Sequence, residues 1–95
     1  MNAEHLNSLT NFFSAAANAN RLRILYALSQ TKERRVSDLA HDLGISLPSV
    51  SQHLKILRQA NLVKFRREAL TKYYSMNKDN GFVSFLLRLF EGPKE

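Results

Sequence analysis

Residues 36–63 read VSDLAHDLGISLPSVSQHLKILRQANLV. Apolar side chains recur at positions i, i+3, i+4 and i+7 in the first eight residues, which predicts a short amphipathic helix over 36–43. Gly44 follows, where helices often end in a left-handed residue. Ser46 is a preferred N-cap and Pro48 lies in the first turn of a second helix, expected over 46–60. Two short helices joined by a glycine-containing turn form a helix-turn-helix pattern.

The second helix of this pair has two chemically different faces. At about 100° per residue, one face gathers apolar side chains and is expected to be buried. The other face is rich in hydroxyl and amide groups and consists of Pro48, Ser51, Gln52, Lys55 and Gln59. No acidic residue occurs between Asp42 and Arg67. Because a helix pair alone is a weak indicator of DNA binding, the composition of this face is the stronger argument, since it suits base edges and phosphates.

A β-hairpin is expected directly after the second helix. Residues 62–67 alternate apolar and basic side chains, residues 72–76 are rich in aromatic strand formers, and residues 68–71 form the turn. Alternation places Val63 and Phe65 inward and Lys64 and Arg66 outward, so the exposed side is expected to be basic. Basic residues on an edge strand also block sheet aggregation. Beside a helix-turn-helix, we favour contact with phosphates.

Helical spacing of apolar residues predicts further helices over 4–17 and 21–30, with a polar loop over 31–35. A last helix over 81–91, capped by Asp79 or Asn80, is apolar nearly all round. Since exposed apolar surface promotes aggregation, we predict a twofold-symmetric dimer through the two terminal helices. The predicted interface residues are Leu6, Leu9, Phe12, Phe13, Phe82, Phe85, Leu86 and Leu89.

The composition fits one small domain over residues 1–95, with 44% apolar and 23% charged residues. Fourteen Lys and Arg against eight Asp and Glu give a net charge of +6. Between Arg21 and Lys72, eleven basic residues stand against four acidic ones. This surplus favours a polyanionic partner, nucleic acid first and an acidic membrane surface second, although net charges of this size also serve solubility alone. The absence of cysteine excludes disulfides, thiolate metal sites and cysteine nucleophiles.

Other function classes lack the residues they need. The sequence has no apolar run approaching the roughly 18 residues of a membrane span and no signal-peptide pattern, so we expect a cytoplasmic protein that does not bind membranes. It has no glycine-rich phosphate loop and no Ser-His-Asp arrangement in a strand-turn-helix setting. It is also too short to enclose a substrate cleft. We therefore expect a protein that is not an enzyme and uses no cofactor.

The three histidines are weak candidates for metal ligands. Asp38, His41 and Asp42 lie within about one turn of the helix over 36–43, a spacing that could hold a metal. We favour a solvated helix face and predict no metal site. His53 lies at the edge of the buried side of its helix and is expected to be hydrogen-bonded and partly buried. His5, near the terminus, has no evident partner.

Three stretches of the sequence resemble the ArsR/SmtB family of bacterial transcriptional repressors. They are ANRLRIL at 19–25, the segment 36–63 with SQHLK at its centre, and YSM at 74–76. The resemblance covers roughly residues 6 to 90. It implies a mainly α winged helix-turn-helix fold with a β-hairpin wing, in the order α-α-α-α-β-β-α.

The same resemblance implies a homodimer that binds a palindromic operator in double-stranded DNA and releases it when an inducer binds. The helix over 46–60 would enter the major groove, and the wing, residues 62–76, would meet the backbone or the minor groove. The residues implied to contact DNA are Ser46, Leu47, Ser49, Ser51, Gln52 and Lys55 on the helix and Arg66, Arg67 and Lys72 on the wing.

The sequence departs from the family at its sensor sites. Thiolate sensors carry a Cys-x-Cys-like pair where this chain has Arg35 and Ser37, and the residues of the other familiar metal site, Asp, His and Glu, are absent from 81–90. The wing tip has Ala69 where the family often has glycine. The remaining possibilities are an unknown small-molecule inducer, bound between the first and last helices, or control by protein abundance alone. An alternative reading is a winged-helix module that binds an acidic protein instead of DNA.

Overall fold

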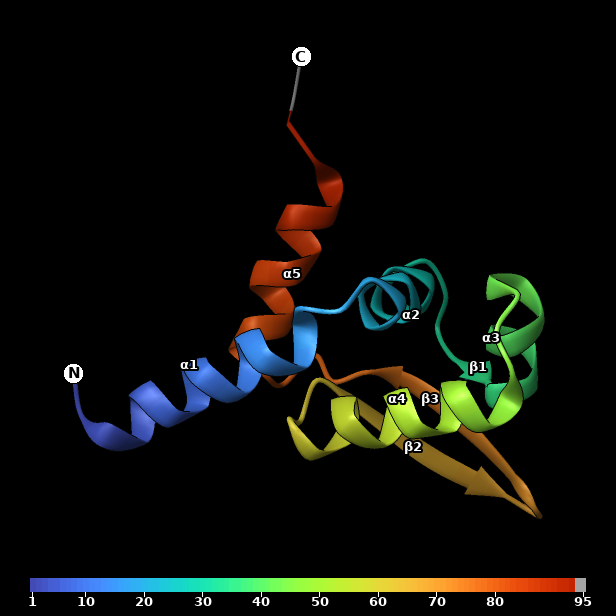
Figure 1. The fold of residues 1–95 in the computed structure, drawn as a ribbon. Coiled ribbons are helices and arrows are strands. Elements are labelled where there is room, and N and C mark those ends of the chain that lie inside the picture. Colours follow the sequence, from blue (N-terminus) through green and yellow to red (C-terminus); the bar gives the residue numbers. More distant parts are fainter. Residues whose placement is uncertain (94–95) are drawn as a thin grey trace.

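Within residues 1–93, which a computed structural model describes, the chain forms five helices and three short strands (Figure 1). Residues 94 and 95, the end of the predicted domain, lie outside the described residues. The elements are α1 (Ala3–Ala16), α2 (Ala19–Ser29), β1 (Arg34–Arg35), α3 (Val36–Leu43), α4 (Leu47–Gln59), β2 (Val63–Glu68), β3 (Thr71–Met76) and α5 (Gly81–Glu91). The predicted mainly α fold with a β-hairpin wing is confirmed.

Side-chain caps explain where most of these helices begin. A side-chain oxygen accepts a hydrogen bond from a backbone N–H two or three residues further on at Asn2, Asn18, Ser46 and Asn80. Such a cap typically stabilises a helix by about 1 kcal/mol over alanine. The cap at Asn18 starts α2 at Ala19, two residues earlier than the apolar spacing predicts.

The turn between α3 and α4 has the conformation that its glycine predicts. Gly44 adopts a φ of 66°, in the left-handed region, and its N–H points back to the last carbonyls of α3. The N–H of Ile45 donates to the carbonyl of Ala40 at 3.1 Å, which closes the end of the helix. The sharp turn sets α4 across α3 in the helix-turn-helix arrangement (Figure 1).

The strands form one antiparallel sheet in the order β1-β3-β2. Glu68 pairs with Thr71, so the wing turn contains only Ala69 and Leu70, and not the four residues 68–71 expected from the sequence. Ala69 takes a φ of 54°, a region that a residue with a Cβ rarely adopts. Strand β1 pairs with β3 inside the expected loop 31–35. A two-residue strand is too short to produce a periodic pattern.

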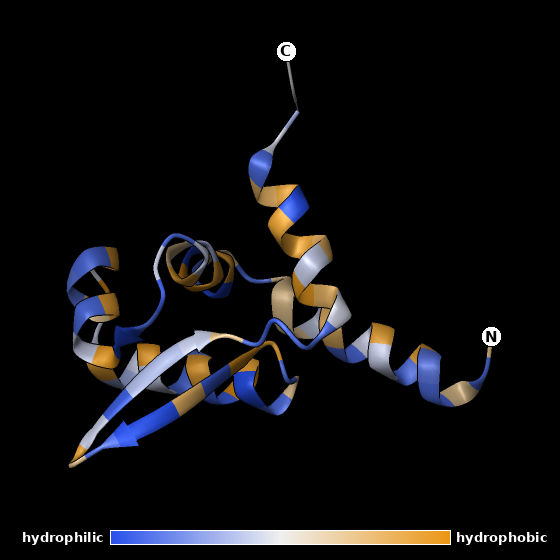
Figure 2. Ribbon diagram, turned by 180° about the vertical axis from the view of Figure 1, so that it is seen from behind, coloured by the Kyte–Doolittle hydropathy of each residue, from blue (hydrophilic) through white to orange (hydrophobic). Residues whose placement is uncertain are grey.

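The core collects apolar side chains from every helix and from the two wing strands. Its fully buried members include Ile24, Leu25, Leu39, Leu54, Leu57, Leu62 and Val83. Apolar residues also continue along α1 and α5 where these helices extend from the rest of the molecule (Figure 2). The wing and the helix-turn-helix are therefore held by one shared core, while parts of the terminal helices remain uncovered.

The terminal helices differ from the expectation at two of the predicted interface residues. Phe12 is 3% exposed and stacks on Phe82 with ring centroids 4.7 Å apart, and Leu86 is 2% exposed. Phe12 and Leu86 are thus core residues of this chain and are not left for a second copy to cover. Leu9 and Phe82 are half-buried. The exposed members of the predicted set are Leu6, Phe13, Phe85 and Leu89.

Candidate nucleic-acid interface

The outer face of α4 displays most of the helix residues expected to contact DNA. Val50, Leu54 and Leu57 are fully buried and fix the rotation of the helix about its axis. This rotation exposes Ser51, Gln52 and Lys55 on the outside, while Ser46 and Leu47 lie exposed at the N-terminal end. The remaining member of the set, Ser49, is half-buried.

The wing residues expected to contact DNA lie on two different faces of the hairpin. Arg67 pairs with Lys72 across the strands, and both are two residues from the Phe65–Tyr74 pair. Because side chains alternate along a strand, these four residues share one face. Arg66 pairs with Tyr73 and projects from the opposite face. The structure therefore brings Arg67 and Lys72 together and separates them from Arg66.

Two cations meet on the aromatic ring of Phe65. The guanidinium carbon of Arg58, from α4, lies 4.9 Å from the ring centroid, and the Nζ of Lys72 lies 4.7 Å from it. Such cation–π contacts hold the charged groups in place beside the ring. The face of the wing that carries Arg67 and Lys72 is therefore the one that faces α4.

Arg58 is a candidate that sequence reasoning missed. On the helical wheel it lies next to the apolar edge that contains Leu54, so nothing in the periodicity distinguishes it from a solvent-exposed arginine. Only the position of the wing shows that Arg58 lies between the two surfaces expected to meet DNA. Its proximity to a basic hairpin in the sequence is the one available signal, and that signal is weak.

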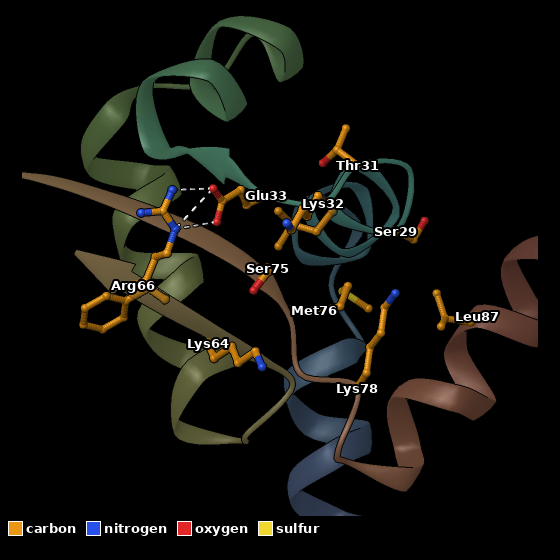
Figure 3. A pocket seen from close by; sticks show the side chains of 12 residues that line it. Ser29, Thr31, Lys32, Glu33, Lys64, Arg66, Ser75, Met76, Lys78 and Leu87 are labelled. Carbon is orange, nitrogen blue, oxygen red and sulfur yellow. Dashed lines mark hydrogen bonds and ion pairs between the residues drawn. The ribbon is translucent and has the colours of Figure 1, made fainter. Parts of the chain in front are cut away.

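Arg66 is engaged by carboxylates. Its Nη2 lies 2.6 Å from Oε1 of Glu33 and its Nε lies 3.0 Å from Oε2 (Figure 3). Its Nη1 lies 3.2 Å from the carboxylate of Glu68. Its guanidinium also stacks over Tyr73 at 4.5 Å. The hydrogen bond from Arg66 holds the pKa of Glu33 below its usual value, against the opposing effect of desolvation. Arg66 thus ties the wing to the segment before β1, and its charge is already balanced.

The acidic residues of α3 also have arginine partners. Arg35 donates two hydrogen bonds of 3.0 Å to Asp38, which lowers the pKa of that carboxyl, and Arg34 pairs with Asp42. His41 is exposed. Within residues 1–93, no group of three or more His, Cys, Asp or Glu side chains is placed to hold a metal ion.

His53 has the environment expected from the sequence. It is half-buried, and its Nδ1 lies 3.4 Å from Nη1 of Arg21, whose Nε donates to the carbonyl of Ala15 at 2.6 Å. The histidine therefore connects α4 to the junction between α1 and α2. His5 is exposed, and its backbone N–H serves the cap at Asn2.

None of the helices in the described part of the chain is both long and apolar enough to cross a membrane.

Comparisons with known proteins place the chain among bacterial regulators. A family model described as bacterial regulatory protein, arsR family, matches residues 18–64. The nodulation protein NolR of Rhizobium meliloti is 50% identical over 68 residues, which are 72% of this chain and 55% of NolR. The arsenical resistance operon repressor of Bacillus subtilis is 36% identical over 76% of this chain and 70% of that protein.

A solved structure supports the same assignment. The homodimeric winged helix-turn-helix DNA-binding domain of a possible ArsR-family regulator from Mycobacterium bovis superposes with a TM-score of 0.82. It is 34% identical and is matched over 94% of this chain and 80% of that one. The chain spans about half the length of the first curated relatives that it matches.

Proposed function

The chain belongs to the ArsR family of bacterial regulatory proteins, and on that basis we propose that it is a sequence-specific, DNA-binding transcriptional regulator that acts as a homodimer. By analogy with the repressor relative from Bacillus subtilis, we propose that it represses transcription. We also propose that it acts in the cytoplasm and has no catalytic role.

The observation that carries this proposal is the exposed face of α4. Ser51, Gln52 and Lys55 are all exposed on it, and no acidic residue follows until the wing. A glutamine can donate to and accept from adenine at once in the major groove, a contact that discriminates bases by about 1–3 kcal/mol. The face supplies hydrogen-bonding groups for bases and a cation for phosphates in one exposed area.

The α4-facing side of the wing supplies further positive charge. Arg58, Arg67 and Lys72 lie on or beside it, and two of them contact the ring of Phe65. Contacts of such cations with phosphates add affinity that falls as salt rises and depends little on base sequence. We therefore propose that α4 selects the DNA sequence and that the wing adds affinity for DNA of any sequence.

The dimer is supported by the terminal helices. Leu6 and Phe13 on α1 and Phe85 and Leu89 on α5 are between 42% and 57% exposed. Exposed apolar side chains on two neighbouring helices are typical of a surface that a second copy covers. A twofold dimer presents two copies of α4 to half-sites about one helical turn of DNA apart, near 34–36 Å, which matches a palindromic operator.

The experiment is selection of bound duplexes from a pool of random DNA, with a chelator present. We expect enrichment of an inverted repeat whose halves are spaced by about 10 base pairs. The Gln52→Ala variant should enrich a more degenerate half-site. A pool that stays random after selection, with the protein folded, contradicts the proposal and favours a protein partner for the basic surface.

A further inference from the structure

A groove of about 800 Å³ lies outside the surface assigned to DNA (Figure 3). Its walls come from the end of α2 and the turn after it, from the strands β2 and β3, and from α5. Lys64 and Arg66 line it, so it opens on the face of β2 opposite to Arg67. It is also not the place between the first and last helices where the sequence suggested a ligand.

Positive charge dominates this groove. Among residues 1–93, its charged lining residues are Lys32, Lys64, Arg66 and Lys78, with the single carboxylate of Glu33. Arg66 and Glu33 neutralise one another through their paired hydrogen bonds. None of the three lysines makes an ion pair within the described part of the chain. Within residues 1–93, three lysines without an ion-pair partner therefore remain around one concave surface.

The three lysines come from different parts of the chain. Lys32 lies in the turn after α2, Lys64 on β2 and Lys78 in the turn before α5. Figure 3 shows them on different sides of Ser75 and Met76, with the Arg66–Glu33 pair at one end. Like charges repel, and charges of one sign lining a cleft concentrate their field within it, where an ion of opposite charge is attracted.

The interior of the groove is not only polar. Leu28, Met76 and Leu87 border it, and Ser75 adds a hydroxyl group. Leu28 and Met76 are almost fully buried, so the half-buried Leu87 supplies the apolar surface that a ligand can reach. Small-molecule sites commonly combine an apolar lining with a few polar groups that fix orientation. A ligand suited to this groove has negative groups at its edge and a compact apolar body.

We propose that this groove binds a small organic anion that carries two or more carboxylate or phosphate groups on a compact carbon skeleton. Its negative groups pair with Lys32, Lys64 and Lys78, and its body packs against Leu87. The proposal does not depend on DNA binding, and it concerns a site that contains no cysteine and no metal ligand set.

The test is isothermal titration calorimetry of the full chain without DNA, at about 0.15 M salt, so that long-range attraction is screened. The probe is benzene-1,3,5-tricarboxylate, and benzene-1,3,5-trimethanol is its uncharged control. We expect one site per chain with a dissociation constant below about 1 mM for the acid and none for the alcohol.

Matched variants distinguish the groove from general attraction to a basic protein. Lys32→Glu and Lys78→Glu each reverse one charge in the groove, and Lys55→Glu makes the same change on α4. We expect the first two to weaken binding of the acid at least about tenfold and the third to change it less than about twofold. Circular dichroism checks that all three variants are folded.

Three results overturn the proposal. They are no measurable heat with the acid up to about 10 mM, equal weakening in Lys55→Glu and the groove variants, and equal binding of the alcohol. DNA titrations identify the competing occupant, the DNA backbone. If the groove binds phosphates of DNA instead, Lys32→Glu and Lys78→Glu weaken DNA binding as much as Lys55→Glu, while the acid does not bind.

Discussion

The guanidinium of Arg66 holds the carboxylate of Glu33 with two of its nitrogens, at 2.6 Å and 3.0 Å from the two oxygens. The two residues are 33 positions apart and join the middle of β2 to the turn before β1. Bidentate pairs between an arginine and a carboxylate are directional, so they fix the relative position of the two side chains as well as balancing their charges. The three wing residues expected to contact DNA therefore divide into Arg66, which positions the hairpin, and Arg67 and Lys72, whose face is turned toward α4.

This division predicts different salt dependence for two neighbouring arginines. Arg67→Ala should lower the slope of log affinity against log salt by about one unit, because one phosphate contact is lost. Arg66→Ala should change the slope by less than about half a unit. Fluorescence anisotropy with a labelled operator, repeated over a series of salt concentrations, measures both slopes. Equal slopes for the two variants contradict the division.

Gln52 should control sequence preference. We expect Gln52→Ala to weaken binding of the operator by about 1–3 kcal/mol and to leave binding of a scrambled duplex nearly unchanged. Gln30→Ala, an exposed glutamine at the end of α2, is the matched control and should change neither affinity. Anisotropy titrations with the two duplexes give the ratio of the affinity for the operator to the affinity for the scrambled duplex. A Gln52→Ala variant that retains the full ratio would exclude Gln52 from base recognition.

The exposed apolar residues of α5 should hold the dimer together. Leu89→Glu places an unpaired charge in the proposed interface, which costs about 3–5 kcal/mol of association free energy. Leu70→Glu makes the same change at the wing tip, where Leu70 is 96% exposed, and should leave the dimer intact. Sedimentation velocity gives the oligomeric state and circular dichroism the folding. A dimeric Leu89→Glu variant contradicts the proposed interface.

The helix-turn-helix could be predicted from the sequence because its signals are local. The 3.6-residue periodicity, Gly44 and Ser46 each act within a few residues of their own position, and the structure has the turn where they place it. The apolar period also separated Val50, Leu54 and Leu57 from the exposed face of α4 correctly. The residues of the candidate site that lie on α4 could be predicted from the sequence for the same reason.

The roles of the wing and of the terminal helices depended on contacts between distant residues. The alternation of side chains along the strand predicted that Arg66 lies on an outer face. It could not predict that Arg66 pairs with Glu33, which is 33 residues away. In the same way, the sequence placed both Phe12 and Phe13 in the predicted dimer interface. Only the stacking of Phe12 on Phe82 shows that Phe12 belongs to the core. The periodicity of a sequence shows which face of one helix or strand is apolar. It does not show which other element packs against that face.

The Arg66–Glu33 pair should also respond to acid. The folded-state pKa of Glu33 lies below its usual value of 4.5, chiefly because Arg66 donates hydrogen bonds to its ionised form. The pair therefore contributes its full share to the free energy of unfolding above about pH 4.5. This contribution is lost as the pH falls through the lower folded-state pKa of Glu33. Carboxyl carbon shifts of Glu33 in an NMR titration should show a midpoint below 4.5, which moves back up in Arg66→Ala. A midpoint of 4.5 or above in the unmodified protein contradicts the pairing in solution.

The central claim is that the α4 surface reads a DNA sequence, and it is tested most directly by fluorescence anisotropy. The protein is titrated into the labelled duplex from upstream of its own gene, and into a scrambled duplex, at several salt concentrations with a chelator present. We predict a preference for the upstream duplex of about 10³-fold or more, with affinity that falls steeply as salt rises. Weak binding of equal strength to both duplexes would contradict the claim.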